Sequence, residues 1–131
     1  MIRVFLSEQQ DEKFYAKMGR YFASLDIAKE LERQVYNKPH TTWYVFTLRQ
    51  HVIGFASVYS GMTHFFLDNL YVLPEHRGQG IATEIVEEIT RRHEGKPIRC
   101  IANNPYALKV FDRFGFVEVG QNGKYKKLVK H

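Results

Sequence analysis

One stretch of the chain has residue types and spacing suited to binding phosphate, the sequence LYVLPEHRGQGIAT from Leu70 to Thr83. An apolar run ends there in a turn with glycines at positions 78 and 80, and a helical pattern begins at Ile81. Glycine adopts positive φ at little cost and lets the backbone approach a ligand closely. The free N–H groups and the positive dipole end of a helix start attract an anion. The stretch therefore predicts a phosphate or pyrophosphate site, hence a nucleotide-containing ligand, with Arg77 adding positive charge.

Two common phosphate-binding motifs do not match this stretch. A P-loop requires Lys directly after its second glycine, and no Lys follows Gly80. A dinucleotide-binding turn requires a third glycine, and Ala82 stands at the wrong spacing for it. The stretch instead resembles the Arg/Gln-x-x-Gly-x-Gly/Ala signature of the GCN5-related N-acetyltransferase (GNAT) superfamily, which Arg77, Gly80 and Ala82 satisfy.

The surroundings of this signature support the same resemblance. In that family a strand reading roughly Leu-x-Val-x-Pro comes first, as Leu70, Val72 and Pro74 do here, and a long helix follows. A second family motif, an Asn followed by a short helix that ends in Gly-Phe, resembles NNPYALKVFDRFGF at residues 103–116. The resemblance covers residues 40–131 well and the first forty residues in outline.

The resemblance implies an α+β (mixed α/β) domain with the GNAT acyl-CoA N-acyltransferase fold. Its central sheet is mostly antiparallel, strands 4 and 5 are parallel and splay apart, and helices flank the sheet. Acetyl-CoA would lie in the opening, with its pantetheine arm on the main chain of residues 70–72 and its pyrophosphate on the N–H groups of residues 78–83. Asn104 would also contact the cofactor, although its place before a helix equally suits a plain cap. The residues assigned to the cofactor are Leu70, Tyr71, Val72, Arg77, Gly78, Gln79, Gly80, Ile81, Ala82, Thr83, Asn104 and Phe111.

The family reaction is direct attack by a primary amine on the thioester in a ternary complex, without an acyl-enzyme. The protein must orient both reactants, accept an amine proton and stabilise an oxyanion, for which a backbone N–H near Val72 is expected. The family's usual acid is a Tyr, but Phe111 stands at that position and cannot donate a proton. Tyr106 or Tyr71 could replace it, or the thiol could leave as a thiolate because its pKa is about 8.5.

The sequence also leaves open which residue is the general base. Some relatives use a Glu on the fifth strand, where this chain has Arg99. Asp68 is the first candidate, acting directly or through water; its alternative role is a carboxylate that only attracts a cationic amine. His64 is the second, because imidazole titrates near neutral pH. Cys100 is expected to be a buried structural thiol. The histidines and carboxylates lack metal-ligand spacing, so we expect no metal.

Composition is consistent with a small intracellular enzyme. The 131 residues predict a single domain over residues 1–131, large enough for one core. Neither a secretion signal nor a membrane span is expected, and a single cysteine suits the cytoplasm. A formal charge of +5 fits a polyanionic cofactor or simple solubility. Nucleic acid binding ranks last, since only this charge and four lysines near the C-terminus favour it, Lys124, Lys126, Lys127 and Lys130.

Alternating and β-branched runs predict the strands that must position the site. The first strand is residues 1–6, and three more form an antiparallel meander at 41–48, 52–59 and 64–73. Strand alternation lets only one of Asp68 and Asn69 face inward. Residues 98–102 form a short strand, and Asn122-Gly123 closes a hairpin between 116–120 and 125–129.

Helical spacing and caps predict four helices. A capping box of Ser7 and Gln10 begins a helix over residues 8–22, and Ser24 caps a second with Ala28, Leu31 and Val35 on its apolar face. A third follows the glycine turn, and a fourth runs from Asn104-Pro105 to a cap at Gly115. The predicted order is β-α-α-β-β-β-α-β-α-β-β.

Two readings of function remain open at this point. An acetyl-CoA-dependent N-acetyltransferase acting on an amine, small or on a protein, follows from the resemblance. A non-catalytic sensor that binds acyl-CoA is the alternative, and the missing Tyr at Phe111 supports it. The sequence does not identify the acceptor, because the segments that form the acceptor site in this family are those where the resemblance is weakest. A homodimer is possible with either function.

Overall fold

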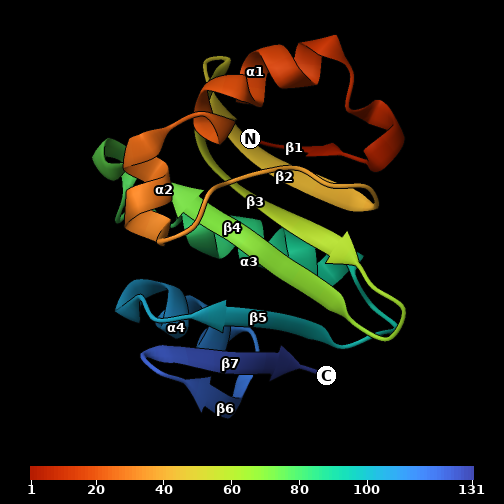
Figure 1. The fold of residues 1–131 in the computed structure, drawn as a ribbon, viewed down its shortest axis with the longest axis vertical. Coiled ribbons are helices and arrows are strands. Elements are labelled where there is room, and N and C mark those ends of the chain that lie inside the picture. The colour runs from red at the N-terminus through yellow and green to blue at the C-terminus, as the bar shows by residue number, and fades with distance from the viewer.

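Seven strands form one sheet in the order β1-β2-β3-β4-β5-β7-β6, as seen in the computed structural model of residues 1–131 (Figure 1). All neighbouring strands are antiparallel except β4 and β5. The predicted order of helices and strands is confirmed, with two additional 3-10 turns. The strands are β1 Ile2–Phe5, β2 Thr41–Leu48, β3 His51–Ser60, β4 Phe65–Val72, β5 Ile98–Ala102, β6 Val117–Asn122 and β7 Tyr125–Lys130.

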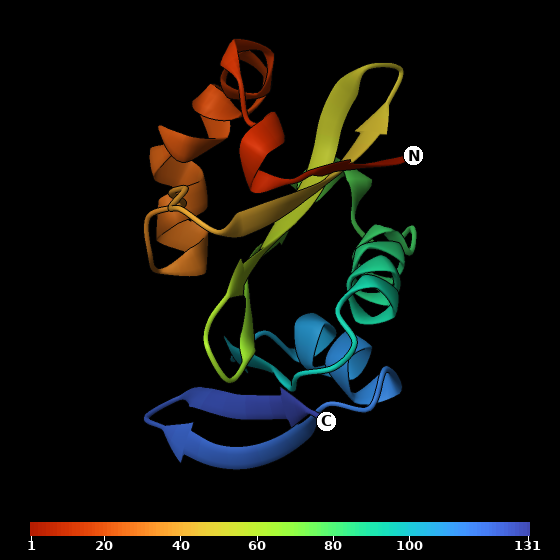
Figure 2. The same cartoon turned by 90° about the vertical axis from the view of Figure 1, so that its right-hand side faces the viewer.

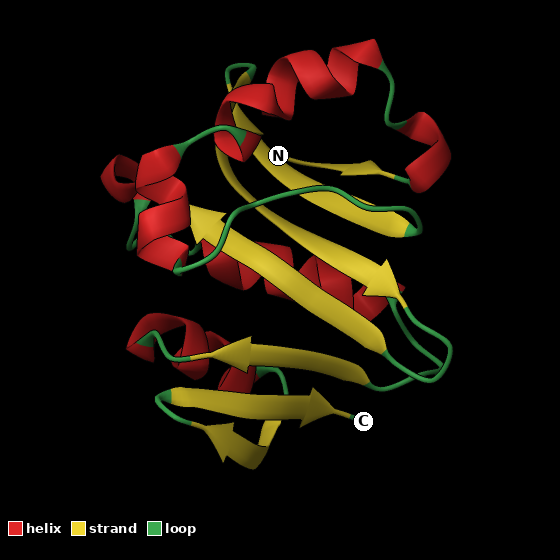
Figure 3. Cartoon of the chain, viewed as in Figure 1, coloured by secondary structure: helices red, strands yellow, loops and turns green.

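The helices cover the two faces of the sheet in pairs. They are α1 Glu12–Phe22, α2 Leu25–Leu31, α3 Ile81–Arg92 and α4 Pro105–Arg113, with 3-10 turns η1 Ser7–Gln9 and η2 Pro74–His76. Figure 2 shows α1 and α2 on one side of the strands and α3 and α4 on the other. Figure 3 separates helices from strands by colour and shows the same layers.

The parallel pair β4 and β5 separates almost at once. Only Phe65 with Ile98 and Phe66 with Arg99 are paired, so β4 has no strand neighbour on that edge from Leu67 onward. This divergence confirms the splayed strands expected from the family resemblance. Its consequence is a length of β4 main chain that faces a cleft rather than a neighbouring strand.

Two apolar cores form, one on each face of the sheet. The core under α3 and α4 contains Ile85, Val86 and Ile89 of α3, all fully buried. The core under α1 and α2 is mainly aromatic: Phe14, Trp43 and Phe55 are buried together with Met18, and the ring of Trp43 makes tilted contacts with those of Phe14 and Phe55. Burial of these side chains is the main favourable term that holds the helices to the sheet.

Strand β4 contains a β-bulge that reverses its side-chain alternation. Asp68 pairs with Ser57 and Tyr71 with Phe55, so two residues of β4, Asn69 and Leu70, oppose one of β3. Asn69 has φ 60°, the left-handed conformation that Asn tolerates better than most residues. Leu67 and Tyr71 would share a face in a regular strand, yet they lie in opposite cores. The predicted strict alternation is therefore wrong across this segment.

The start of α1 also differs from the prediction. Residues 7–9 form a 3-10 turn, and Asp11 is the cap, because its Oδ1 accepts from the N–H groups of Lys13 and Phe14. The predicted capping box of Ser7 and Gln10 is wrong. Gln10 instead donates its amide to the carbonyls of Phe5 and Thr41, which ties the turn to the sheet.

The second helix begins where predicted and ends earlier. Ser24 Oγ accepts from the N–H of Ile27, which confirms the cap. The helix stops at Leu31, since Glu32 adopts φ 60°, and Val35 is buried beyond the helix rather than on its apolar face. This early stop brings residues 30–33 to the cleft described below.

Gly54 on β3 is required for the close approach of α3. A Cβ there would stand 3.1 Å from Cγ2 of Ile81 and 3.2 Å from the carbonyl oxygen of Tyr71. Ile81 begins α3 directly after the glycine turn. The packing of α3 on β3 thus sets the position of that turn.

We expect Gly54→Val to lower the free energy of unfolding by about 1–3 kcal/mol, because overpacking forces α3 away from the sheet. Urea denaturation measures the change. The matched control is Gly19→Ala in α1, where a Cβ meets no other side chain and no distant backbone within 4 Å. That control should gain roughly 0.5–1 kcal/mol from better helix propensity. Equal stability of Gly54→Val and the native chain would contradict the packing role.

Candidate active site

A cleft of about 1130 Å³ opens where β4 and β5 diverge. Its walls come from the end of α2, from β4, from the glycine turn and first turn of α3, from β5 and from α4. All but two of the candidate residues predicted from the sequence line it; Gln79 and the second candidate base, His64, do not. Those present are Asp68, Leu70, Tyr71, Val72, Arg77, Gly78, Gly80, Ile81, Ala82, Thr83, Asn104, Tyr106 and Phe111.

The glycine turn offers an uninterrupted row of hydrogen-bond donors. None of the six backbone N–H groups from Gly78 to Thr83 donates to a protein acceptor, and the first paired one is that of Glu84, 3.0 Å from the carbonyl of Gly80. Gly78 and Gly80 have φ 78° and 80°, and a Cβ on either would meet no atom within 4 Å. Unpaired donors at a helix start form an anion-binding cradle. The geometry thus suits a phosphate group at this turn.

Arg77 holds the turn in place through three contacts. Its Nε donates to the carbonyl of Val72 at 2.8 Å, and its two terminal nitrogens lie 2.7 and 2.8 Å from the carboxylate oxygens of Glu30. Its guanidinium also stands 5.2 Å from the ring centroid of Tyr71. The hydrogen bond from Arg77 lowers the pKa of the Glu30 carboxyl. The predicted positive charge is therefore paired with Glu30, and Arg77 joins β4, the turn and α2.

The β-bulge gathers a small polar network beside the cleft. Ser57 Oγ donates to the carbonyl of Asp68 at 3.3 Å and accepts from Nδ2 of Asn69 at 2.9 Å. Oδ1 of Asn69 is buried and has no partner. Asp68 and Asn69 both line the cleft, whereas regular alternation would have turned one of them away.

The Asp68 carboxylate has one partner. Oδ1 accepts from Nη1 of Arg33 at 3.3 Å, and the two side chains are 26% and 44% exposed. Arg33 follows α2, and sequence reasoning did not assign it to the site. A carboxylate that carries a single long hydrogen bond retains lone pairs for another donor.

The two tyrosines that could replace the family's general acid differ in their surroundings. Tyr71 is buried, and burial together with the neighbouring Glu30 raises its pKa to about 12. Tyr106 is 80% exposed at the start of α4. Its N–H donates to Oδ1 of Asn104 at 2.8 Å, so Asn104 does cap the helix and keeps its amide NH₂ for other partners. Phe111 is buried against Phe116, with ring centroids 5.1 Å apart.

Two other candidates are placed less favourably for chemistry. Cys100 lines the cleft, and burial, with a smaller effect of the Asp68 charge, raises its pKa to about 12. Its thiol stays protonated at neutral pH, which agrees with the expected structural role. His64 does not line the cleft and bonds to Thr63 through Nδ1.

Several cleft residues were missed in the sequence. Glu30, Glu32 and Arg33 lie at the end of α2, and Lys109 and Arg113 lie on α4 without an ion-pair partner. The sequence did contain a signal for Lys109 and Arg113, since residues four apart lie on the same face of a helix. It contained none for the residues at the end of α2, because the predicted helix continued to Val35.

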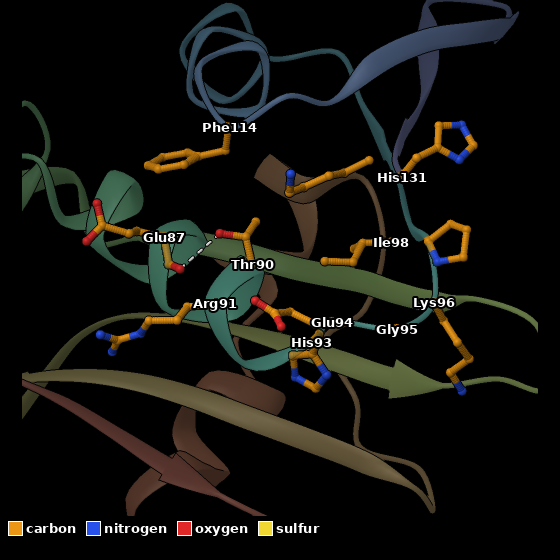
Figure 4. A pocket seen from close by; sticks show the side chains of 12 residues that line it. Glu87, Thr90, Arg91, His93, Glu94, Gly95, Lys96, Ile98, Phe114 and His131 are labelled. Atoms are coloured by element: carbon orange, nitrogen blue, oxygen red, sulfur yellow. Dashed lines mark hydrogen bonds between the residues drawn. The ribbon is translucent and has the colours of Figure 1, made fainter.

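A second hollow, of about 660 Å³, lies at the far end of α3 and contains no residue of the glycine turn (Figure 4). His93 lines it and bonds through Nε2 to the hydroxyl of Tyr44 at 2.6 Å. Figure 4 shows that the charged side chains around it are spread apart rather than directed at one point.

The sequence matches the model of the acetyltransferase (GNAT) family over residues 2–116. The chain belongs to the GNAT family. The match spans β1 to the end of α4, so the glycine turn and all of the cleft lining except Asn122 and Tyr125 lie within it. No curated protein matches the chain by sequence.

Solved structures share the fold at low sequence identity. Escherichia coli ElaA aligns with TM-score 0.82 and 9% identity over 100% of this chain and 99% of its own. An acyl-CoA N-acyltransferase from Pseudomonas aeruginosa aligns with TM-score 0.80 and 12% identity over 100% and 99%. A GNAT acetyltransferase from Elizabethkingia anophelis with acetyl-CoA bound aligns with TM-score 0.66 and 13% identity over 99% and 97%. These neighbours establish the GNAT acyl-CoA N-acyltransferase fold.

Two further features of the chain bear on its chemistry. No helix has the length and apolar character needed to cross a bilayer. His, Cys, Asp and Glu side chains nowhere gather in a group of three that could hold a metal ion. The family match and the cleft together support acyl transfer in general.

The half-buried His93 gives a testable pH dependence. Burial, with Arg92 and Lys96 nearby, lowers its pKa from 6.5 to about 4. The unfolded chain then binds a proton at a pH where the folded chain does not, so stability falls as pH decreases below 6.5. We expect a loss of about 1–2 kcal/mol between pH 6.5 and 5, allowing for solvent screening.

Urea denaturation of the native chain and of His93→Gln at several pH values measures this loss. The variant should show a flatter profile over the same range. An unchanged slope in His93→Gln would contradict the assignment.

Proposed function

We propose that this GNAT protein transfers an acetyl group from acetyl-CoA to a primary amine by direct attack in a ternary complex. The observation that carries the proposal is the row of six unpaired N–H groups at the mouth of the cleft. A related fold has been solved with acetyl-CoA bound, in the Elizabethkingia anophelis protein. The polyanionic cofactor also fits the +5 formal charge of the chain.

The cleft residues fit the parts of the cofactor. The N–H groups from Gly78 to Thr83 would hold the pyrophosphate, and the amide of Asn104 would add a donor. The open edge of β4, from Leu70 to Val72, would bond to the pantetheine arm as a strand does. Lys109 and Arg113, one helical turn apart and free of ion pairs, would attract its remaining phosphate.

Acetyl-CoA supplies the thioester when bound, and the chain supplies orientation and proton transfer. The amine nitrogen bonds to the acetyl carbon while the carbon–sulfur bond breaks and the sulfur leaves with its electron pair. Asp68 accepts the proton released by the amine, directly or through water. A main-chain N–H of β4 near Val72 stabilises the negative charge that develops on the carbonyl oxygen.

Departure of the sulfur as a thiolate fits the phenols of the cleft. The pKa of Tyr71, about 12, lies well above the value of about 8.5 for a thiol, so proton transfer from Tyr71 to sulfur is uphill. Tyr71 and the exposed Tyr106 would act instead as hydrogen-bond donors. This account removes the need for an acid at Phe111.

A non-catalytic acyl-CoA sensor is the second candidate. It is favoured by the buried phenyl ring of Phe111 at the family's acid position and by the pairing of Asp68 with Arg33. An assay of free thiol released from acetyl-CoA in the presence of amines distinguishes the transferase from the sensor. Turnover supports the transferase, and cofactor binding without turnover of any amine supports the sensor.

Cofactor binding is tested by thermal melting with excess acetyl-CoA. A ligand at about 100 times its dissociation constant adds roughly 2.7 kcal/mol, which corresponds to a rise of several degrees. Gly80→Val should abolish the rise, because its side chain would occupy the open side of the turn at φ 80°.

Gly95→Val is the matched control, since Gly95 has φ 97°, equally open surroundings and no place in the cleft. It should lose stability yet keep the acetyl-CoA shift. Retention of the shift in Gly80→Val would show that the pyrophosphate binds elsewhere.

The role of Asp68 is tested with Asp68→Asn. Loss of a general base lowers turnover by about 10²–10⁴-fold, while the dissociation constant of acetyl-CoA should stay nearly unchanged. Thiol release measures turnover and calorimetry measures binding. Unaltered turnover would exclude Asp68 from the mechanism.

A further inference from the structure

The end of α2 brings three ion pairs to one side of the cleft. Glu30 pairs with Arg77, Glu32 with Lys124, and Arg33 with Asp68. Glu30, Glu32, Arg33 and Asp68 line the cleft, and none of them belongs to the cofactor cradle. Since each carboxylate has one cation, this part of the cleft carries no net charge from these pairs.

The Arg33–Asp68 pair alone has spare hydrogen-bonding capacity on both partners. Its single contact is 3.3 Å long, Nε and Nη2 of Arg33 have no acceptor, and Oδ2 of Asp68 has no donor. In contrast, the Glu30 and Glu32 carboxylates each receive two donors, with contacts of 2.7 to 2.8 Å. A ligand in the cleft would therefore meet free donors and a free acceptor side by side at Arg33 and Asp68.

These two side chains complement a molecule that carries opposite charges close together. An ammonium group alone on Oδ2 would make two cations share the single negative charge of Asp68, and the site would carry a net positive charge. A carboxylate next to the ammonium would bind the guanidinium and keep the site neutral. We propose that Arg33 and Asp68 select an acceptor whose primary amine lies beside a carboxylate, as in an α-amino acid. The inference rests on the proposed function and specifies its acceptor.

A side-chain link across the cleft points to a small acceptor. Glu32 accepts from Nζ of Lys124 and from the hydroxyl of Tyr125, both at 2.7 Å, which joins the end of α2 to the β6–β7 hairpin. Figure 1 shows these two segments on either side of the opening between β4 and β5. These two contacts of Glu32 bridge the side of the cleft where the acceptor would bind, so a free amino acid fits there better than a lysine on a folded protein.

The test compares α-amino acids with their decarboxylated amines, such as phenylalanine with phenethylamine, in the thiol-release assay. We expect kcat/KM for the amino acid to exceed that for the matching amine by about tenfold or more, the effect of one charge-assisted bidentate contact. Arg33→Gln should reduce this ratio to near one, and Arg33→Lys, which keeps the charge without the planar fork, should give an intermediate ratio.

Lys126→Gln is the matched control, because it also removes one cation from an ion pair, the one with Glu118, and neither partner lines the cleft. Its ratio should equal that of the native chain. A native preference for the amines, or a ratio unchanged in Arg33→Gln, would overturn the inference while leaving the transferase function intact. Acetyl-CoA binding without turnover of either class would contradict the proposed function and the inference with it.

Discussion

The loss of hydrogen bonding between β4 and β5 after two residue pairs is the constraint on which the site depends. Buried main-chain groups require partners, and at a strand edge without a neighbouring strand these are side chains, such as Arg77 on the carbonyl of Val72, water or a ligand. The crossover from β4 returns through α3, whose first N–H groups are also unpaired. One break in the sheet therefore creates an open strand edge and an anion cradle at the same cleft.

The polar contacts around the cleft hold its separate walls in register. Arg77 joins the carbonyl at the end of β4 to Glu30 on α2, and Glu32 joins α2 to the last hairpin. Such partly exposed pairs contribute little to global stability, typically below about 1 kcal/mol. These pairs instead fix the positions of the cleft walls, because through them α2 contacts segments that the two apolar cores do not bring together. In the proposed function, side-chain pairs would therefore form the acceptor side and main-chain groups the cofactor side.

The difference between main-chain features and side-chain pairs explains how much of the structure can be predicted from the sequence. Periodicity, glycines and caps locate every helix and strand in order, and the main-chain cradle follows from the glycines at 78 and 80. The bulge at Asn69 was not anticipated, although a spacing of three between Leu67 and Leu70 in a strand indicates one. Arg33 and Glu32 were missed because the end of α2 depends on the left-handed conformation of a non-glycine residue, Glu32, which tertiary contacts impose. Local pattern predicts main-chain features better than long-range ion pairs.

The central claim is that the unpaired N–H groups of residues 78–83 bind the pyrophosphate of acetyl-CoA. Amide hydrogen exchange, read residue by residue by NMR, tests it most directly. In the free protein these amides should exchange rapidly, and saturating acetyl-CoA should slow them, while the amides of Glu94 and Gly95, which are also unpaired but lie outside the cleft, should keep their exchange rates. Unaltered exchange at residues 78–83 in a protein that is shown to bind acetyl-CoA would contradict the account.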